Sequence, residues 1–392
     1  MKVNDIYEVK IIDDNHNGNG IGKIDGFPVF VKGTVCGDIV KVRIVRVLKK
    51  YAVGEVVSFA FKDDRHISVL CPYYDKCGGC NLMHVSYERE VLLKKRYLNR
   101  LFKDKFDDFV FCDRFNYRNK VKFHVVNGKL GFYDESSNDL ICVSSCMLLD
   151  EEINGLISFL FRTNLLYVKE VVIRKGDDGL LLYVLGSVSL DDLEVLKECN
   201  SLISIYVNNE LVYGDSFIVS SLGNVKYFVN HKAFFQVNSE CCYHLYDEIK
   251  KNVLGNSLLD LYCGIASIGI YVSDVCDRVV GVEVNPESVR CARENIRANN
   301  IDNYEVILGD ASVISDSFDT IVVDPPRSGL SREVISNINS MRAKRLIYVS
   351  CNPSTLKRDI ELLGNYDVIS IKGFNMFPCT KHVECLCVFD LK

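Results

Sequence analysis

The sequence lacks three features that would each assign it to a broad class of protein. Its longest apolar runs, such as residues 180–185, fall far short of the roughly 20 residues that a membrane-spanning helix needs. Residues 1–5 do not resemble the start of a secretory signal peptide. The 47 Lys and Arg residues do not outnumber the 52 Asp and Glu residues, so the net charge of −5 excludes a uniformly basic coat but allows local basic patches. We therefore expect a cytoplasmic protein with no membrane partner.

The composition is that of a folded protein with more than one core. The chain has 392 residues, of which 48% are apolar and 25% charged, and this length exceeds one ordinary hydrophobic core. Its 17 cysteines, an odd number in a long chain, favour a metal site or a catalytic thiol in a reducing compartment over a disulfide scaffold. We find no internal repeat and no low-complexity linker. The changes of pattern described below predict a monomer with domains over residues 1–60, 61–240 and 241–392.

The first two predicted domains carry basic segments among short strands. Glycines break residues 1–60 into strands without a helical period, which favours a small β-barrel. Lys41 and Arg43 fall on one face of the strand predicted over residues 39–47, and either form a solvated edge or face RNA. Residues 61–240 read as a mixed α+β domain with a cysteine-rich loop and a basic helix over residues 86–105. In residues 116–123, cations including Arg118 and Lys120 precede or alternate with apolar residues.

The last predicted domain has the alternation of a doubly wound α/β fold. Strands with little polar alternation are predicted over residues 257–262, 278–284, 304–308, 318–323 and 346–350. A helix over residues 286–300 begins with Pro286, which suits a first helical turn. This order predicts a parallel, Rossmann-like sheet, in which ligands bind at the carboxyl ends of the strands.

Acidic residues stand at those strand ends. Glu283 can accept hydrogen bonds from a ribose, which suits NAD and S-adenosylmethionine equally. The preceding turn favours S-adenosylmethionine, because Ala266 occupies the second glycine position of the G-x-G-x-x-G turn that a pyrophosphate requires. Asp310 can accept from an adenine amino group, and Asp324 with its two following prolines forms a rigid acidic turn beside the reacting methyl. The pattern predicts a Rossmann-like, S-adenosylmethionine-dependent methyltransferase.

Cys351 is the candidate nucleophile of this domain. It ends a strand, directly before a helix with Asn352 as N-cap and Pro353 as first residue, and we expect the helix N-terminus to lower its pKa. The alternative is a buried cysteine that only fills space. Oxygen and nitrogen acceptors need no thiolate, whereas addition of a thiolate to carbon 6 of a pyrimidine activates carbon 5. Glu384, at the start of the last apolar strand, is the candidate base for the carbon 5 proton, with His382 as the alternative.

A second group of cysteines suggests a metal centre. Cys71, Cys77 and Cys80 lie in one short loop whose two glycines allow the backbone to wrap closely around a metal. The loop has one C-x-x-C pair, whereas a four-thiolate zinc site usually has two, so an iron–sulfur cluster and zinc both remain open. The candidates for the fourth ligand are Cys112, Cys142 and Cys146.

Together these motifs resemble those of the RNA 5-methyluridine methyltransferases, in particular the 23S rRNA (uracil-5-)-methyltransferases. The resemblance rests on residues 234–238, 324–327, 350–353 and 377–384, and the glycine-rich N-terminal segment resembles a TRAM domain, an OB-like barrel. It departs from the family pattern at Ala266, where glycine is frequent, and at Cys379, where a polar residue is usual.

The resemblance implies specific roles for residues of this chain. It implies that Cys351 is the nucleophile and Glu384 the base. The cofactor contacts that it implies are Gln236, Tyr262, Glu283 and Asp324, to which Asp310 is added on geometric grounds. The ligands that it implies for a [4Fe–4S] cluster are Cys71, Cys77, Cys80 and Cys146.

The expected partner is an RNA substrate, with 23S rRNA favoured and tRNA as the alternative. A 5-methylcytosine enzyme would place a second cysteine in residues 324–327, and an amino-group methyltransferase would usually have an aromatic residue after the two prolines. A non-catalytic RNA-binding module would explain the barrel but not the pair of Cys351 and Glu384. Phe234 and Phe235 either belong to the core or stack on a base.

Overall fold

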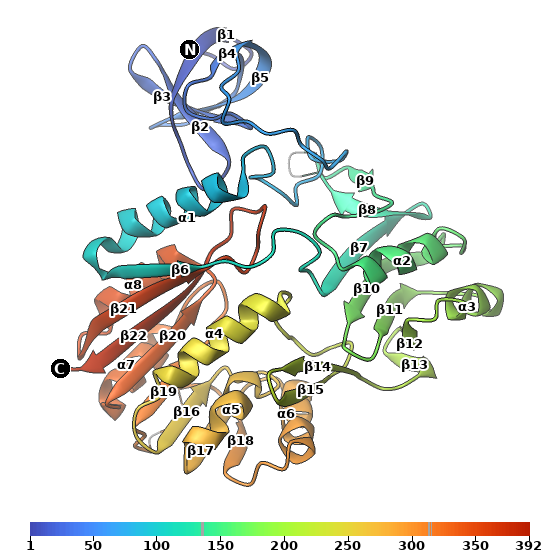
Figure 1. Ribbon diagram of the computed structural model, residues 1–392, viewed down its shortest axis with the longest axis vertical. Coiled ribbons are helices and arrows are strands. Elements are labelled where there is room, and N and C mark those ends of the chain that lie inside the picture. The colour runs from blue at the N-terminus through green and yellow to red at the C-terminus, as the bar shows by residue number, and fades with distance from the viewer. Residues whose placement is uncertain (135–136, 313, 315) are drawn as a thin grey trace.

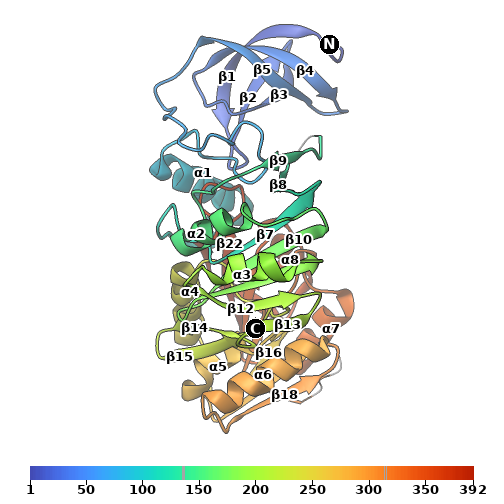
Figure 2. The same cartoon turned by 90° about the vertical axis from the view of Figure 1, so that its right-hand side faces the viewer.

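In the computed structural model, residues 1–134, 137–312, 314 and 316–392 are described. They form a barrel, a central sheet and a C-terminal α/β unit, with the barrel at one end of the long axis in both views (Figures 1 and 2). The barrel closes in the order β1-β2-β3-β5-β4. Its strands are β1 (Ile6–Asp14), β2 (Asn19–Ile24), β3 (Phe27–Lys32), β4 (Ile39–Val47) and β5 (Ala52–Phe61).

Alternation along β4 shows why this segment closes into a barrel. Val40, Val42 and Ile44 are buried in the barrel core, while Lys41 and Arg43 between them are exposed. The sequence prediction that both cations share one outward face is confirmed. Whether that face binds RNA stays a prediction.

The central sheet has the order β13-β12-β11-β10-β7-β8-β9. Its strands are β7 (Lys120–Val126), β8 (Lys129–Tyr133), β9 (Leu140–Cys142), β10 (Val168–Lys175), β11 (Leu180–Gly186), β12 (Leu202–Val207) and β13 (Glu210–Gly214). Helices α2 (Glu151–Leu160) and α3 (Leu190–Lys197) pack on one face over a shared apolar core. A hairpin of β14 (Ile218–Leu222) and β15 (Val225–Val229) leads toward the C-terminal unit.

The C-terminal sheet has the order β18-β17-β16-β19-β20-β22-β21-β6. Strands β16 (Ser257–Leu261), β17 (Arg278–Glu283), β18 (Tyr304–Leu308), β19 (Thr320–Val323) and β20 (Arg345–Ser350) run parallel. Next to them lie β22 (Glu384–Leu391), antiparallel to β20, and then β21 (Tyr366–Phe374). The helices are α4 (Ser239–Lys251), α5 (Ser267–Val272), α6 (Pro286–Ala298), α7 (Arg332–Met341) and α8 (Pro353–Leu362). The predicted α/β fold is confirmed.

One edge of this sheet comes from the middle of the chain. β6 (Phe106–Val110) pairs in parallel with β21, and α1 (Tyr87–Phe102) lies between the barrel and β6 (Figure 1). Residues 87–110, which the sequence pattern grouped with the central domain, therefore pack on the C-terminal sheet. The polar β6 sequence gave no sign of this, because an edge strand takes its partner from elsewhere in the fold. Within the described chain, no helix has both the length and the apolar character to cross a bilayer.

Candidate active site

The catalytic candidates meet at the end of the C-terminal sheet where the parallel strands have their carboxyl ends. Asp324 follows β19, Cys351 follows β20, and Glu384 begins β22, which runs in the opposite direction. The last paired residues of β20 and β22 are Ser350 and Cys385, so the next position in this register sets Cys351 opposite Glu384. Opposite residues in an antiparallel pair have Cβ atoms about 4.5–5.5 Å apart. Two residues separated by 33 positions in the chain are thus cross-strand neighbours.

Cys351 opens onto a cavity of about 220 Å³. The cavity lies between the start of α8, the turn after β19 and the segment before β22. Its lining includes Cys351, Arg327, Asn352, Lys381 and His382, and it also includes His16 and Asn17 of the barrel and Tyr97 of α1.

The barrel contacts α1 at this cavity through two stacked aromatic rings. The His16 ring, in the turn between β1 and β2, stacks on Tyr97 with centroids 3.6 Å apart. The Tyr97 hydroxyl lies 3.0 Å from Ser354 Oγ in α8. The N-terminal domain therefore forms one wall of the cavity, a contact that no local sequence pattern indicated.

The surroundings of Cys351 raise the pKa of its thiol, whereas the sequence predicted a lowered pKa. Burial raises the pKa of the Cys351 thiol to about 11, and the nearby Glu384 and Asp324 add to the increase, while Arg327 opposes it. The expectation that the helix N-terminus would leave this thiol with a lowered pKa is wrong. The helix pattern itself is confirmed, since the Asn352 side chain accepts from the backbone of Ser354 and Pro353 is the first residue of α8.

The two carboxyls beside Cys351 also have raised pKa values. Glu384 is 2% exposed, and burial together with Asp324 holds its pKa well above the usual range. Burial raises the pKa of Asp324 to about 7, and Asp260 adds to this effect. A bound cation would favour the ionised form of both acids and of Cys351. His382 differs, because burial lowers its pKa to about 4 and leaves the ring neutral near pH 7.

A smaller cavity, of about 30 Å³, adjoins this end of the sheet. Gln236, Tyr262 and Asp324 line it together, as does the pair Phe234 and Phe235. The structure therefore brings together three of the cofactor residues named from the sequence. Phe235 is buried, whereas Phe234 is 62% exposed, so the two rings have different environments.

Glu283 and Asp310 lie outside the lining of that small cavity. The Glu283 carboxylate accepts from the backbone N–H of Gly264 at 3.1 Å and of Asn285 at 2.7 Å. Asp310 is exposed, and its Oδ1 accepts from the backbone and hydroxyl of Ser312. Glu283 thus contacts the turn beside the cavity, whereas Asp310 is held in a local turn of its own.

The turn after β16 has an unusual backbone. Tyr262, Gly264 and Ala266 have φ angles of 63°, 57° and 67°, in the left-handed region that costs L-residues energy. A glycine in place of Ala266 would be free of this strain, because glycine adopts positive φ without a Cβ clash. Strained backbone of this kind is typical of ligand-binding turns.

Asp260 is a buried residue of the site that the sequence pattern did not single out. It is 1% exposed, and its Oδ2 accepts from Gly269 N and from the Tyr304 hydroxyl, both at 3.0 Å. Its Oδ1 has no hydrogen-bond partner among the described atoms. Burial raises the pKa of Asp260 to about 7. The available signal was an acid inside the otherwise apolar strand of residues 257–261.

The segment that leads into Glu384 is fixed by a buried ion pair on α1. Nζ of Lys94 lies 2.9 Å from Oε1 of Glu90, and both side chains are 0% exposed. These two side chains also form hydrogen bonds to Asn375 Oδ1 (2.6 Å), to the Phe377 carbonyl (3.2 Å) and from the Cys379 backbone N–H (2.9 Å). The sequence indicated only a basic helix here, because the partners that allow burial lie nearly 300 residues away.

The cysteine-rich loop is attached to the same segment. The backbone N–H groups of Asn81 and Leu82, directly after Cys80, donate to the Cys379 carbonyl at 2.9 and 3.0 Å. Cys379 has a φ of 64° and packs in a small apolar cluster with partly buried Cys80 beside it. The loop with the cysteines and the loop that precedes Glu384 thus form one connected unit.

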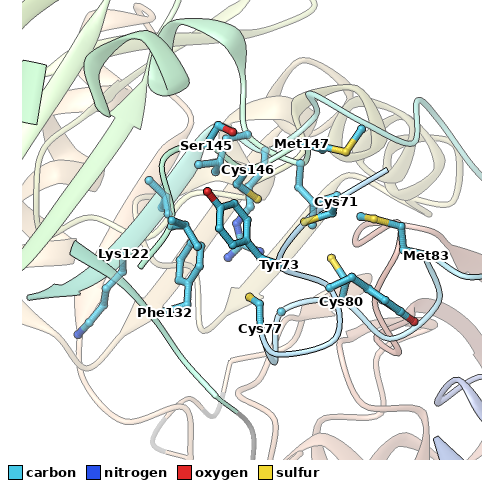
Figure 3. Close-up of a pocket in the computed structure, with 17 residues that line it drawn as sticks. Cys71, Tyr73, Cys77, Cys80, Met83, Lys122, Phe132, Ser145, Cys146 and Met147 are labelled. Atoms are coloured by element: carbon cyan, nitrogen blue, oxygen red, sulfur yellow. The ribbon is translucent and has the colours of Figure 1, made fainter. Parts of the chain in front are cut away.

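Four cysteines line a cavity of about 260 Å³ (Figure 3). The sulfur atoms of Cys71, Cys77, Cys80 and Cys146 face this common space, among aromatic and aliphatic side chains. Burial raises the pKa of the Cys77 and Cys146 thiols. Adjacent buried thiolates would repel one another, so a cation is needed to hold the four in ionised form.

The other two candidate ligands lie elsewhere. Cys112 and Cys142 are absent from the described lining of this cavity. Cys112 groups instead with Glu240 and His244 of α4, whose ligand atoms lie within 4.8 Å of one another. In the described residues, no three of the four cavity sulfur atoms all lie within 4.8 Å of one another.

Comparison with known families gives three matches along the chain. Residues 308–391 match the family described as tRNA (Uracil-5-)-methyltransferase. Residues 1–57 match the TRAM domain, and residues 241–346 match the Methyltransferase small domain.

Whole-chain relatives agree with these matches. The chain is 30% identical over 447 residues to a protein of Staphylococcus aureus strain COL named as an uncharacterized RNA methyltransferase, with 99% of each chain covered. It is 29% identical over 450 residues to a protein of the same description from Staphylococcus epidermidis strain ATCC 12228, with 100% of this chain and 99% of the other covered.

A solved structure shows the same fold from end to end. The crystal structure of Pyrococcus abyssi tRNA (uracil-54, C5)-methyltransferase in complex with S-adenosyl-L-homocysteine has a TM-score of 0.82 and 24% identity to this chain. The match covers 98% of this chain and 100% of the other. The predicted combination of an N-terminal TRAM barrel with a Rossmann-like methyltransferase unit is confirmed.

Proposed function

This chain belongs to the RNA (uracil-5-)-methyltransferase family, and on that premise we propose that it transfers a methyl group from S-adenosylmethionine to carbon 5 of a uridine in RNA. The observation that carries the proposal is the cross-strand position of Cys351 and Glu384 at the carboxyl ends of the parallel strands, beside a cavity of about 220 Å³ that Cys351 lines. A thiol and a carboxyl in this arrangement suit attack on carbon 6 and removal of the carbon 5 proton from one ring.

In the proposed mechanism, Cys351 gives its proton to solvent and its sulfur bonds to carbon 6 of the uracil, while the electrons of the carbon 5–carbon 6 double bond move to form an enolate. The positive charges near the thiol, Arg327 and the N-terminus of α8, favour this ionisation. S-adenosylmethionine, when bound, supplies an electrophilic methyl on a positively charged sulfur. After carbon 5 has gained the methyl, Glu384 takes the carbon 5 proton and the Cys351 sulfur leaves carbon 6. The raised pKa of Glu384 makes it a strong base once it has ionised.

The proposed cofactor contacts are Gln236, Tyr262, Glu283, Asp310 and Asp324. Gln236, Tyr262 and Asp324 are supported by their shared cavity beside Cys351. Glu283 is supported by its place at the end of β17, next to the strained turn that closes this cavity. Asp310 has the least support, because its carboxylate is exposed and bonded to Ser312.

The proposed ligands of a [4Fe–4S] cluster are Cys71, Cys77, Cys80 and Cys146. Their donor set fits, since four thiols and no carboxylate or imidazole line the described cavity. The choice of an iron–sulfur cluster over zinc is supported by the single C-x-x-C pair in the loop and by the resemblance described above. The cluster would cross-link the cysteine-rich loop to the central sheet, and the loop in turn holds the segment before Glu384.

The proposed substrate is 23S rRNA, with the RNA in contact with the three domains proposed over residues 1–60, 61–240 and 241–392. The support is the joint presence of a barrel and a four-cysteine cavity, the combination that resembles the ribosomal branch. The alternative is tRNA, which a specific observation favours: the solved structure with the same fold is a tRNA (uracil-54, C5)-methyltransferase, and it matches the barrel too.

A direct assay separates the two substrates. Unmodified 23S rRNA and unmodified tRNA are each incubated with the protein and S-adenosylmethionine labelled in the methyl group, and the nucleosides are then analysed. We expect labelled 5-methyluridine from 23S rRNA. Label in 5-methyluridine of tRNA alone would make tRNA the substrate.

A further inference from the structure

Two cations lie directly opposite each other on adjacent strands of the central sheet, close to the candidate active site. β7 and β10 pair antiparallel, and Lys120 stands directly opposite Arg174 in their register. Like charges at directly opposite positions destabilise a sheet. Arg118, two residues before Lys120, adds a third positive charge and donates from Nε to the Lys120 carbonyl at 2.9 Å.

In the described chain, Lys120 and Arg174 have no acidic partner, whereas Arg118 also lines the four-cysteine cavity. Arg174 is only 4% exposed, its Nη2 donates to the Ala233 carbonyl, and its Nε has no hydrogen-bond partner. Among the ion pairs that the described residues form, none involves Arg118, Lys120 or Arg174. Their neighbours are paired: Lys122 with Glu170, and Lys175 with Asp150 and Glu152. A buried, uncompensated guanidinium is costly, so an anion from outside the chain is expected to neutralise it.

This cation group directly adjoins the cofactor cavity. Asn119, between Arg118 and Lys120, donates from Nδ2 to the Gln236 carbonyl at 3.1 Å and from its backbone N–H to Val237 at 2.9 Å. The carbonyl that accepts from Arg174 belongs to Ala233, the residue before the exposed Phe234. A ligand held by these cations would therefore lie next to the segment that carries Phe234 and Gln236.

We propose that Lys120 and Arg174, together with Arg118, form a binding site for a phosphate group of the RNA strand next to the target uridine. The inference rests on the proposed function, because it takes RNA as the substrate. Guanidinium and ammonium groups are the usual phosphate ligands, and a phosphodiester supplies the negative charge that this part of the sheet lacks. A phosphate fixed here would anchor the strand while the uridine turns out toward Cys351.

The site gives RNA binding a particular pH dependence. Burial lowers the pKa of Lys120 to about 7, and Arg174, Arg118 and Lys122 lower it further while Glu170 opposes them. A bound phosphate favours the charged ammonium, so the pKa of Lys120 is higher in the complex than in the free protein. RNA binding then takes up a proton, and affinity falls as the pH rises through 7 toward 9.

The test compares Lys120→Gln with Lys122→Gln in the full-length protein. Both residues lie on the same strand and face, but Lys122 is already neutralised by Glu170. RNA affinity is measured by fluorescence anisotropy over a salt series, and S-adenosylmethionine binding by calorimetry. We expect Lys120→Gln to weaken RNA binding about tenfold and to lower the salt slope by about 1. Lys122→Gln should change both by much less, and neither variant should alter S-adenosylmethionine binding.

A neutral methylphosphonate, placed in turn at each position around the uridine, identifies the anion. At one position the methylphosphonate should lower the RNA affinity of the wild type about as much as Lys120→Gln does. At that same position it should not lower the RNA affinity of Lys120→Gln any further. Equal affinity of wild type and Lys120→Gln for unmodified RNA would overturn the proposal. The proposal would also be overturned if Lys120→Gln lost affinity for free inorganic phosphate but bound RNA as tightly as the wild type does. If the wild type binds RNA but methylates no uridine, the proposed function fails, while the comparison of the two lysine variants still decides the phosphate site.

Discussion

Lys94 and Glu90 of α1 form an ion pair that is completely buried, with Nζ 2.9 Å from Oε1, and the pair holds the segment that leads to the proposed base. A buried charge without water or a partner is strongly destabilising, and Lys94 is the nearer of the two cations that face Glu90, with Arg114 Nη2 at 3.6 Å. The pair links a helix from the middle of the chain to the loop before Glu384, and so connects folding of the chain to the geometry of the site.

Lys94→Met should therefore destabilise the protein by up to about 3–5 kcal/mol, because it removes the nearer cation of the buried Glu90 carboxylate and leaves only Arg114, at 3.6 Å. Urea unfolding measures this loss. The matched control is Lys251→Met, which breaks an exposed pair with Asp247 at the same i, i+4 spacing and should cost less than about 1 kcal/mol. Similar losses for the two variants would show that the buried pair has no special role.

Cys351→Ala should lower methyl transfer by about 10³-fold or more, since the covalent step disappears with the thiol. Affinity for S-adenosylmethionine, measured by calorimetry, should change less than about twofold, because Cys351 lies outside the lining of the small cavity. Cys142→Ala, at an exposed cysteine, serves as the control and should keep full activity. Substantial turnover by a folded Cys351→Ala protein would refute the nucleophile assignment.

Glu384→Gln should stop the reaction after the carbon–sulfur bond has formed, because an amide cannot take the carbon 5 proton. We expect a protein–RNA adduct that survives denaturing electrophoresis with ordinary RNA. His382→Asn tests the alternative base and should form no stable adduct. If instead His382→Asn accumulates the adduct and Glu384→Gln turns over, the roles of the two residues are reversed.

The pH profile should shift when Asp324 loses its charge. Asp324 contributes to the raised pKa of Glu384, and Glu384 must be ionised to act as base. The rate is therefore expected to rise with pH, and in Asp324→Asn this rise should move to lower pH while the maximal rate falls. Asp247→Asn is the control, because Asp247 pairs with Lys251 on the exposed surface of α4, outside the lining of both cavities beside Cys351. An unchanged or upward shift in Asp324→Asn would contradict the assignment.

The metal prediction concerns protein purified without oxygen. It should be brown and contain about four irons per chain, and Cys80→Ser should lower the iron content because it removes one proposed ligand. Cys142→Ser should leave the iron content unchanged, since this exposed thiol lies outside the described cavity lining. Stoichiometric zinc without iron would refute the cluster.

Sequence reasoning succeeded where the signal is local. Asn352 and Pro353 mark the start of α8 because capping depends on a few adjacent residues. The alternation around Lys41 and the apolar parallel strands are likewise properties of short segments, so the barrel and the Rossmann-like sheet could be predicted. Asp324 and Cys351 fall together because parallel strands end at one edge.

The remaining features depend on contacts between distant parts of the chain. Burial of Lys94 requires Asn375, and the charge of Arg174 is conspicuous only because Lys120 lies opposite it in the sheet. The pKa of Cys351 went the other way from the local prediction, since burial and two carboxyls from other strands outweigh the helix N-terminus. The contact of His16 with Tyr97 depends on how the barrel docks.

The central claim is that this protein forms 5-methyluridine through Cys351, and RNA with 5-fluorouridine at the target position tests it most directly. Fluorine replaces the proton that Glu384 would remove, so the reaction should stop as a covalent complex. With S-adenosylmethionine present, mass spectrometry should find one methylated 5-fluorouridine attached to the peptide that contains Cys351. Multiple turnover without an adduct, or a methyl group on a nucleoside other than uridine, would contradict the account.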